Sequence, residues 1–550
     1  MPTGRNMPVL QVQGFRYRYR RQAPWTLKGI DLTVEPGEYV VIAGANGSGK
    51  STLVRACNGL IPHLYPGEMH GHVWVAGLDT RDHAIHDLIV YVGIAFQNPE
   101  AQLFTSSVER EIAFGLESLG LPSNEIRRRV EEAAAFLGIE ALLPRPPHTL
   151  SGGEQQLVVL AAVLALEPRL LILDEPFAHL DAWHAQRLRQ MLCQIRERGI
   201  TLLVVEHHLQ HVLADATRVV VLDGGHIVFD GSPRQAVEED LSRYGIVEPP
   251  AVQWARQLGL PAVALDTAEL VTYLEQWHPS AALPNLSVPS RDRRRGNAPV
   301  IQVENLCARR GARLVLEDVS FCVAEGECLA VVGPNGAGKT TLIRHLNGLL
   351  RGRSGTVRVR DVDVRSTSPA RLARQVGMSF QNPMAQFFKP RVKDELEVGP
   401  RMLGCLDPKW LAGIVERFHL QSLLERSPYT LSEGEKRRLS FAIAMAPRPD
   451  VVILDEPTAG QDARSRSALL ALLHTLREEG HTVILATHDL DFAEACADRW
   501  AVLAGGRLLM VAPPDEVMAN ADVLTQARLA PTAGFYVRQA LKILRGSPKP

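Results

Sequence analysis

The sequence predicts an α/β protein built from two homologous halves. Ordered features recur along the chain at a nearly constant spacing: Lys50 and Lys339 lie 289 residues apart, and Asp174 and Asp455 lie 281 residues apart. In both halves an apolar strand, a glycine-rich loop and a helical pattern follow one another in that order. The length of 550 residues also exceeds what one hydrophobic core organises. These three observations predict a tandem α/β architecture with one domain or more in each half.

Composition excludes several classes of protein. A hydrophobic content of 46% and a charged content of 22% are ordinary for a globular protein, and a net charge of −1 argues against a general nucleic-acid surface. The longest apolar run, residues 157–166, is about half the roughly 20 residues that span a bilayer. The seven cysteines contain no C-x-x-C pair, so neither a zinc site nor a disulfide framework is indicated. We expect a cytoplasmic protein with reduced thiols.

The halves are separated by a stretch without periodic apolar residues. Residues 281–298 are rich in Pro, Ser and Arg, and they are interpreted as a linker. The second half opens at VIQVENL, which matches VLQVQGF near residue 9. We therefore expect a first domain over residues 8–240 and a second domain over residues 299–518.

Each half contains a phosphate-binding loop. The pattern G-x-x-x-x-G-K-[ST] occurs at residues 44–51 and 333–340, between an apolar strand and a helix pattern. Glycines let backbone N–H groups close around phosphates, the lysine adds a point charge, and Ser51 or Thr340 offers a hydroxyl to Mg²⁺. The predicted nucleotide-binding residues are Gly44, Ala45, Asn46, Gly47, Ser48, Gly49, Lys50, Ser51 and Thr52, with Gly333, Pro334, Asn335, Gly336, Ala337, Gly338, Lys339, Thr340 and Thr341.

Two further strands in each half end in ionisable residues. LLILDEP and VVILDEP each end in an acid pair, and successive side chains of a strand point to opposite faces, so the two acids have different roles. We expect Asp174 and Asp455 to bind Mg²⁺, and Glu175 and Glu456 to act as general bases toward water. A histidine ends the next apolar strand in both halves. Its repetition favours a γ-phosphate contact for His207 and His488 over a structural role.

With LSGGEQQ at residues 150–156 between the loop and the acid pair, the series resembles the ABC ATPases over almost the whole of both halves. The resemblance implies a RecA-like α/β core, an antiparallel β subdomain and a helical signature subdomain in each domain. It also implies that the Gln97 and Gln381 side chains touch Mg²⁺ and the attacking water. Two such domains pair head to tail in this family, so Ser432 and Gly434 would complete the site of Lys50, and Ser151 and Gly153 that of Lys339.

The sequence departs from the family at two places. The second signature is LSEGEK, so Glu433 replaces a glycine, and we expect it to crowd and repel a polyphosphate unless it points to solvent. The family stacks adenine on an aromatic residue of the first strands. Tyr19 or Tyr17 can serve in the first half, whereas the second half offers only Arg309 or Arg310. These departures predict two unequal sites.

The segments FQNPEAQLFT and FQNPMAQFFK narrow the resemblance further. A proline favours the first turn of a helix, so bulky apolar residues after it are expected on a short surface helix beside the Gln loop, where a partner docks. The pattern Q-N-P-x-x-Q-Φ-F, followed by V-x-x-E-I-A-F-G-L, resembles the ATPase subunits of energy-coupling factor (ECF) transporters, importers of vitamins and of metal ions such as cobalt. The expected docking residues are Gln102, Leu103, Phe104, Gln386, Phe387 and Phe388.

This resemblance implies partners and a location. A transmembrane T component would dock on these residues, a separate S component would bind substrate, and the chain would lie at the cytoplasmic face of the membrane. The tails over residues 241–280 and 519–550 resemble the short C-terminal helical extension of this group. Two alternatives stay open: the ATPase of a tandem sugar-uptake importer, and a soluble ribosome-associated tandem ABC ATPase.

Overall fold

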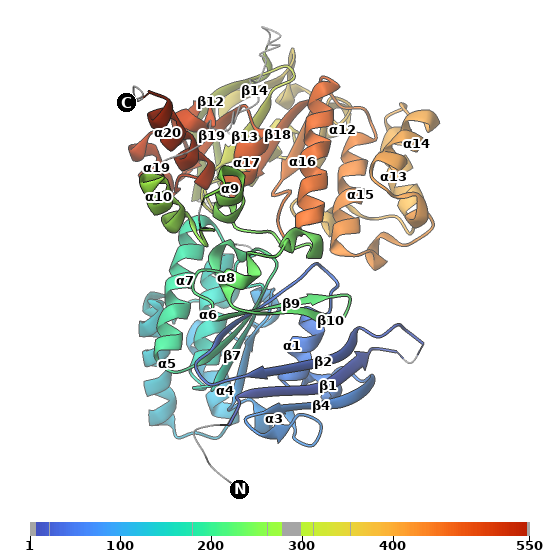
Figure 1. Ribbon diagram of the computed structural model, residues 1–550. Coiled ribbons are helices and arrows are strands. Elements are labelled where there is room, and N and C mark those ends of the chain that lie inside the picture. The colour runs from blue at the N-terminus through green and yellow to red at the C-terminus, as the bar shows by residue number, and fades with distance from the viewer. Residues whose placement is uncertain are drawn as a thin grey trace. The chain divides into compact units, whose positions relative to one another are not determined.

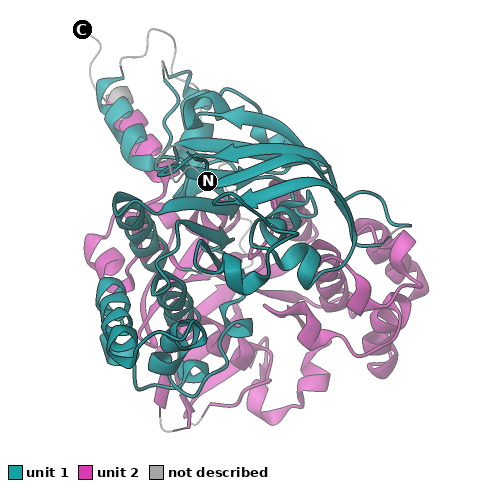
Figure 2. Ribbon diagram, turned by 90° about the horizontal axis from the view of Figure 1, so that it is seen from below, with its two compact units in different colours: residues 1–180, 184–277 teal, residues 181–183, 278–550 magenta. Residues whose placement is uncertain are grey.

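A computed structural model describes residues 7–277, apart from 21, 179 and 261, and residues 299–546, apart from 312 and 353. The chain divides into two compact units, residues 1–180 with 184–277 and residues 181–183 with 278–550, coloured separately in Figure 2. Both units have an α/β fold in which helices pack on β-sheets, as the sequence predicts (Figure 1). The expected linker, residues 281–298, lies outside the described residues.

A six-stranded sheet forms the centre of the first unit, in the order β10-β9-β3-β8-β7-β6. Strands β6, β7, β8, β3 and β9 run parallel, and β10 pairs antiparallel with β9. Strand β3 is buried along its whole length, as is usual for parallel sheets covered on both faces. The bounds are β3 Tyr39–Ala43, β6 Val92–Ala95, β7 Leu170–Asp174, β8 Thr201–Glu206, β9 Arg218–Asp223 and β10 His226–Gly231.

A second, antiparallel sheet of the first unit has the order β2-β1-β4-β5. Strand β1 (Leu10–Arg18) buries Leu10, Val12, Phe15 and Tyr17 and exposes residues between them, so one face packs inward. The other strands are β2 Leu27–Val34, β4 Glu68–Val75 and β5 Leu78–Asp79. This sheet matches the expected antiparallel subdomain.

The helices of the first unit fall into three groups in the sequence. Helix α1 (Lys50–Cys57) follows the first glycine-rich loop, with α2 Leu60–His63 and α3 Ile85–Leu88 after it. The helices α4 Val108–Ser118, α5 Ser123–Leu137 and α6 Gly152–Leu164 pack together, and α7 is Ala182–Glu197. The last group is α8 Pro233–Ala236, α9 Pro250–Leu258 and α10 Thr267–Gln276.

The second unit repeats this plan. Its central sheet has the order β16-β17-β18-β13-β19-β20 and its antiparallel sheet the order β12-β11-β14-β15. The strands are β11 Pro299–Arg310, β12 Arg313–Ala324, β13 Cys328–Val332, β14 Ser354–Val359, β15 Val362–Asp363, β16 Val376–Ser379, β17 Val451–Asp455, β18 Thr482–Thr487, β19 Arg499–Ala504 and β20 Arg507–Ala512. The helices are α11 Lys339–Leu346, α12 Pro369–Leu372, α13 Val392–Met402, α14 Pro408–Arg417, α15 Glu433–Met445, α16 Ala463–Glu478, α17 Leu490–Cys496, α18 Pro514–Met518, α19 Ala521–Ala527 and α20 Ala533–Gly546.

Each central sheet separates two apolar cores. Tyr39, Val41 and Ala43 of β3 face the core under α4 to α7, whereas Val40 and Ile42 face the core shared with the antiparallel sheet and α1. This follows from the two-residue side-chain period of a strand. The carboxyl ends of β3, β7 and β8 are thereby fixed side by side, and the predicted loop, acid pair and histidine follow them. Within the described residues, no helix combines the length and apolarity needed to cross a bilayer.

Candidate active sites

Both glycine-rich loops adopt the closed form that the sequence predicts. The first loop joins β3 to α1, and a Cβ on Gly44 would lie 2.2 Å from the carbonyl oxygen of Leu222, so only glycine fits. The Lys50 ammonium is buried and donates hydrogen bonds of 2.8 Å to the carbonyls of Gly44 and Ala45. The loop therefore holds this charge at the start of α1, where backbone N–H groups also point.

The second loop has the same construction. A Cβ on Gly333 would lie 2.0 Å from the carbonyl oxygen of Leu503. Lys339 donates to the carbonyls of Gly333 and Pro334 at 2.8 and 3.1 Å. The remaining predicted loop residues, Asn46 to Thr52 and Asn335 to Thr341, form the turn and the first helical residues after it.

The acid at each β-strand end lies against the loop hydroxyl. Thr340 donates a 3.1 Å hydrogen bond to Oδ1 of Asp455, and the buried Oδ2 of Asp455 has no hydrogen-bond partner among the described residues. Burial raises the pKa of Asp455 to about 6, because the charged form is removed from water. A buried carboxylate oxygen without a donor beside a hydroxyl suits a hard divalent cation, so these residues fit Mg²⁺.

The first half has the equivalent pair, Asp174 and Ser51. Burial and the neighbouring Glu175 raise the pKa of Asp174, and a hydrogen bond from Ser51 opposes that rise. A cation at this position would favour the charged carboxylate in the same way as at Asp455. The donor set again fits Mg²⁺.

The predicted base and histidine meet in each half. Nδ1 of His207 lies 3.2 Å from Oε1 of Glu175, and Nδ1 of His488 lies 2.9 Å from Oε2 of Glu456. Burial lowers the pKa of both histidines, but the facing glutamates outweigh it and raise the pKa overall. Both glutamates have left-handed backbones, with φ of 49° for Glu175 and 46° for Glu456. Such strain in a non-glycine residue concentrates at functional sites.

The Gln loops differ between the halves. Nε2 of Gln97 donates a 2.7 Å hydrogen bond to Oε2 of Glu175, so the predicted water-binding amide and base are in contact. Among the described residues, Gln381 makes no side-chain hydrogen bond to Glu456. Oε1 of Glu456 instead lies 3.6 Å from the Lys339 ammonium. Burial opposes ionisation of Glu456, but His488 and Lys339 outweigh it and lower its pKa.

Each signature serine caps a helix. The Ser151 hydroxyl accepts from the N–H of Glu154, and the Glu154 carboxylate accepts in return from the Ser151 N–H, at 3.4 and 2.8 Å. Ser432 and Glu435 repeat these bonds in the second half. Both serines are exposed, and neither makes a hydrogen bond or ion pair to the glycine-rich loop of its own half within the described residues. Gly153 and Gly434 follow them in the first helical turn.

Protein atoms of its own unit leave space for a side chain at the position of Glu433. At the matching Gly152, a Cβ would meet no atom within 4 Å. The Glu433 side chain is 72% exposed, and its Oε1 lies 2.7 Å from the Lys436 ammonium. The carboxylate thus points to solvent and is paired, which is the exception that the sequence argument allowed.

In the first half, the structure leaves one of the two tyrosines that the sequence offered for adenine stacking. Tyr17 is wrong as a candidate, because its ring is completely buried and its hydroxyl donates to the carbonyl of Tyr65. Tyr19 is exposed, its hydroxyl lies 3.1 Å from Oγ1 of Thr52, and Arg55 donates to it. In the second half, Arg309 and Arg310 are both exposed at the end of β11. Tyr19 and these arginines stay predictions.

The segments after the Gln loops depart from the expected short helix. Only Pro99–Ala101 and Pro383–Gln386 form a turn of 3-10 helix, each capped by the preceding asparagine. Phe104 and Phe388 are 67% and 63% exposed, whereas Phe387 is buried in the core, so its expected docking role is wrong. The side chains of Gln102 and Gln386 also bond inward to backbone carbonyls, and Leu103 packs against the core.

Sequence reasoning missed the residues that fix these segments. Oε2 of Glu111 accepts from the N–H groups of Phe104 and Thr105 at 3.1 and 2.8 Å. Oε2 of Glu395 accepts from Phe388 and Lys389 at 3.0 and 2.6 Å. The repeated V-x-x-E pattern was visible in the sequence, but an isolated acid on a helix gives no sign of two backbone donors six and seven residues earlier.

Arg437 was also missed. It is buried on α15 and donates to the carbonyls of Phe380 and Gln381 at 3.2 and 2.9 Å, which ties the second signature helix to the second Gln loop. Burial lowers the pKa of this guanidinium. Gln156 at the matching position of the first half makes no such bond among the described residues.

The first half also buries Glu206 beside His207, and burial raises the pKa of Glu206 to about 8.

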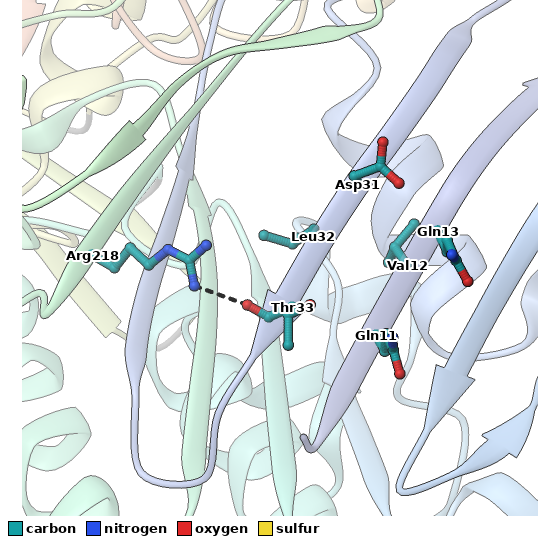
Figure 3. A pocket seen from close by; sticks show the side chains of 7 residues that line it. All are labelled: Gln11, Val12, Gln13, Asp31, Leu32, Thr33 and Arg218. Carbon is teal, nitrogen blue, oxygen red and sulfur yellow. Dashed lines mark hydrogen bonds between the residues drawn. The ribbon is translucent and has the colours of Figure 1, made fainter. Parts of the chain in front are cut away.

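A shallow pocket of about 360 Å³ lies elsewhere in the first unit (Figure 3). It is lined by Gln11, Val12, Gln13, Asp31, Leu32, Thr33 and Arg218. Arg218 already donates to the carbonyl of Thr33 and pairs with Asp230, so its charge is neutralised. None of the predicted nucleotide-binding residues lines this pocket.

Comparison with known proteins fits this geometry. The sequence profile of the ABC transporter family matches residues 27–178 and 316–459, which include both glycine-rich loops, Gln loops, signatures and acid pairs. The chain belongs to the ABC transporter family. It is therefore an ATPase whose two domains bind ATP with Mg²⁺. His207 and His488 lie beyond the matched residues.

Curated relatives extend over nearly the whole chain. A Methanosarcina acetivorans protein named as an ABC transporter ATP-binding protein is 35% identical, over 96% of this chain and 90% of its own length. A Streptomyces coelicolor protein with the same kind of name is 35% identical, over 94% of this chain and 97% of its own length. The tandem arrangement of this ABC ATPase is thus shared by relatives from archaea and bacteria.

Two solved structures match this chain, one of them in fold over most of its length. An archaeal ribosome recycling factor, solved with the ribosomal stalk protein aP1, is 22% identical over 89% of this chain and 88% of that chain, with a TM-score of 0.58. At this identity the likeness concerns the fold alone. The protein cbiO1 from Clostridium perfringens, part of the transporter complex cbiONQ, is 34% identical over 42% of this chain and 91% of that chain, with a TM-score of 0.39.

Proposed function

We propose that this ABC ATPase powers an ECF-type importer for a vitamin or a transition-metal ion. It docks on a transmembrane T component at the cytoplasmic face of the membrane, and a separate S component binds the substrate. Residues 8–240 and 299–518 are assigned to the two ATPase domains. Helices α9, α10, α19 and α20 lie in the proposed extensions, residues 241–280 and 519–550.

The observation that carries this proposal is the pair of exposed phenylalanines beside the Gln loops. Phe104 and Phe388 each lie seven residues after a predicted water-binding glutamine and present most of their surface to solvent. In the first half the ring of Phe104 meets exposed Phe114 edge to face, with centroids 4.9 Å apart. Exposed aromatic pairs favour protein–protein contact. The same place in both halves supports a partner that engages both.

We also propose that the two halves pair head to tail. The first site then joins Lys50, Asp174, Glu175 and His207 to Ser432, and the second joins Lys339, Asp455, Glu456 and His488 to Ser151. The exposed helix N-termini at both signatures support this pairing, because helix N-termini favour an anion and neither signature serine bonds to the glycine-rich loop of its own half within the described residues.

The chain's own residues then have distinct tasks in hydrolysis. Glu175 and Glu456 accept a proton from the attacking water, and the facing histidine orients that carboxylate through the observed Nδ1 contact. The lysine and the loop N–H groups stabilise charge on the phosphate oxygens. Ser51 and Asp174, or Thr340 and Asp455, would hold Mg²⁺, which supplies charge neutralisation on the triphosphate when bound.

Purification from membranes tests the docking proposal. The wild-type chain should be recovered with a multi-spanning membrane protein, and Phe104→Ala with Phe388→Ala should remove that protein from the preparation. Leu64→Ala is the control, since Leu64 is also exposed but lies outside the proposed surface. Recovery with ribosomes instead, or unchanged membrane recovery of the double variant, would overturn the proposal.

A further inference from the structure

The second signature differs from the first by two charges of opposite sign. Glu433 and Lys436 occupy the positions of Gly152 and Gln155 in the first half. Oε1 of Glu433 lies 2.7 Å from the Lys436 ammonium across the first turn of α15. The acidic change in the second half is thus accompanied by a basic one three residues later.

The two side chains of this pair differ in their exposure to solvent. The Lys436 side chain is only 13% exposed, whereas that of Glu433 is 72% exposed. Glu433 is the only hydrogen-bond partner of the Lys436 ammonium among the described residues. Water screens the exposed Glu433 carboxylate, so the attraction within this pair contributes little to stability.

We propose that Lys436 is a positioning residue that neutralises Glu433 and holds its carboxylate aside, so that the second signature accepts a triphosphate. The inference rests on the proposed head-to-tail pairing, in which this signature faces the loop of Lys50. An unpaired carboxylate on the turn that presents Ser432 would repel the phosphates, and the repulsion falls with distance and salt. The second signature is then a working variant of the first.

ATP binding tests this in the full chain. Glu175→Gln and Glu456→Gln prevent hydrolysis, and Lys339→Ala removes the second loop's charge, so that the remaining binding reports the site of Lys50. Lys436→Gln in this background should weaken MgATP binding about tenfold at low salt, and much less at about 0.5 M salt. In a Glu433→Gly background the same change should have less than about a twofold effect.

The same pair of charges can be introduced at the matching positions of the first half. Gly152 has open space around it, so Gly152→Glu places a carboxylate there without a collision. With Lys50→Ala in place of Lys339→Ala, this variant should weaken MgATP binding at the remaining site about tenfold. Adding Gln155→Lys should restore most of the loss. Circular dichroism and the thermal midpoint of each variant check that the fold is kept.

The outcomes distinguish charge compensation at Glu433 from head-to-tail pairing of the halves. An equal effect of Lys436→Gln with and without Glu433 would overturn charge compensation, whatever the pairing of the halves. A Lys436→Gln defect that depends on Glu433 but appears only when Lys50 is the residue removed would retain compensation and overturn head-to-tail pairing. Failure of Gln155→Lys to restore binding would show that the Lys436 effect is local to α15, and it would also contradict the proposal.

Discussion

The two halves of this ABC ATPase share their scaffold but differ in the contacts around the proposed general base. In the first half Glu175 is held by Gln97 and His207, and in the second Glu456 is held by His488 and lies near Lys339. Arg437 ties the signature helix of the second half to its Gln loop, and Gln156 makes no matching bond in the described part of the first half. Repetition of the motifs therefore preserves which groups are present, while the side chains between the motifs decide how each group is restrained.

The largest expected effect concerns the two proposed general bases. Glu175→Gln together with Glu456→Gln should lower ATP hydrolysis by about 100-fold or more, because an amide cannot accept the proton of the attacking water. The single variants should lose different fractions of the activity, since the two glutamates have different partners. Steady-state phosphate release measures this. Equal losses would remove the functional contrast between the halves.

The next effect concerns the two acids proposed to bind Mg²⁺. The pKa of Asp455 rises from 3.8 to about 6 on folding, so between pH 4 and 6 the folded chain keeps a proton that the unfolded chain releases. Stability should thus fall as pH rises through this window, by up to about 3 kcal/mol, and Asp455→Asn should recover it at pH 8.

Urea unfolding of Asp455→Asn at pH 4 and at pH 8, without nucleotide, measures this gain. The variant should be more stable than wild type at pH 8 and similar to it at pH 4, while it loses turnover. Asp174→Asn is the matched variant in the first half, where burial also raises the pKa of the acid. A stability curve of Asp455→Asn that still falls between pH 4 and 6 would contradict the assignment.

A third prediction concerns a contact that the halves share. Glu111→Ala and Glu395→Ala each leave two backbone N–H groups without their acceptor, and each should cost about 1–3 kcal/mol locally. Amide hydrogen exchange of Phe104 and Thr105, or of Phe388 and Lys389, should speed up in the respective variant. Unchanged exchange in either half would show that its phenylalanine is held by other contacts.

The smallest effect concerns adenine. Tyr19→Ala should weaken ATP binding at the site of Lys50 about fivefold, since an aromatic stack is worth about 1 kcal/mol. Arg310→Ala should change binding at the site of Lys339 by less than about twofold, because an exposed guanidinium gives up water to stack. Equilibrium dialysis with one loop lysine removed distinguishes the sites. A larger loss of ATP binding from Arg310→Ala than from Tyr19→Ala would show that the second half has the stronger adenine contact.

Much of the fold and of the sites could be predicted because their signals are local. A glycine pattern between a strand and a helix, or a strand that ends in two acids, contains its chemistry within eight residues. The side-chain contacts could not be predicted in this way. Arg437 meets Gln381 from 56 residues away, and Phe387 is buried although Phe388 beside it is exposed. Such differences depend on packing that no short pattern encodes.

The tether made by Glu111 has a mechanical implication. Because the backbone at Phe104 is bound to α4, only the six residues 98–103 separate it from Gln97, at most about 25 Å of extended chain. Any displacement of Gln97 by the nucleotide would therefore reach the exposed Phe104 through this one short segment, without movement of the hydrophobic core. With a connection this direct, substitutions far from this segment would rarely uncouple ATP hydrolysis from the movement of the docked partner.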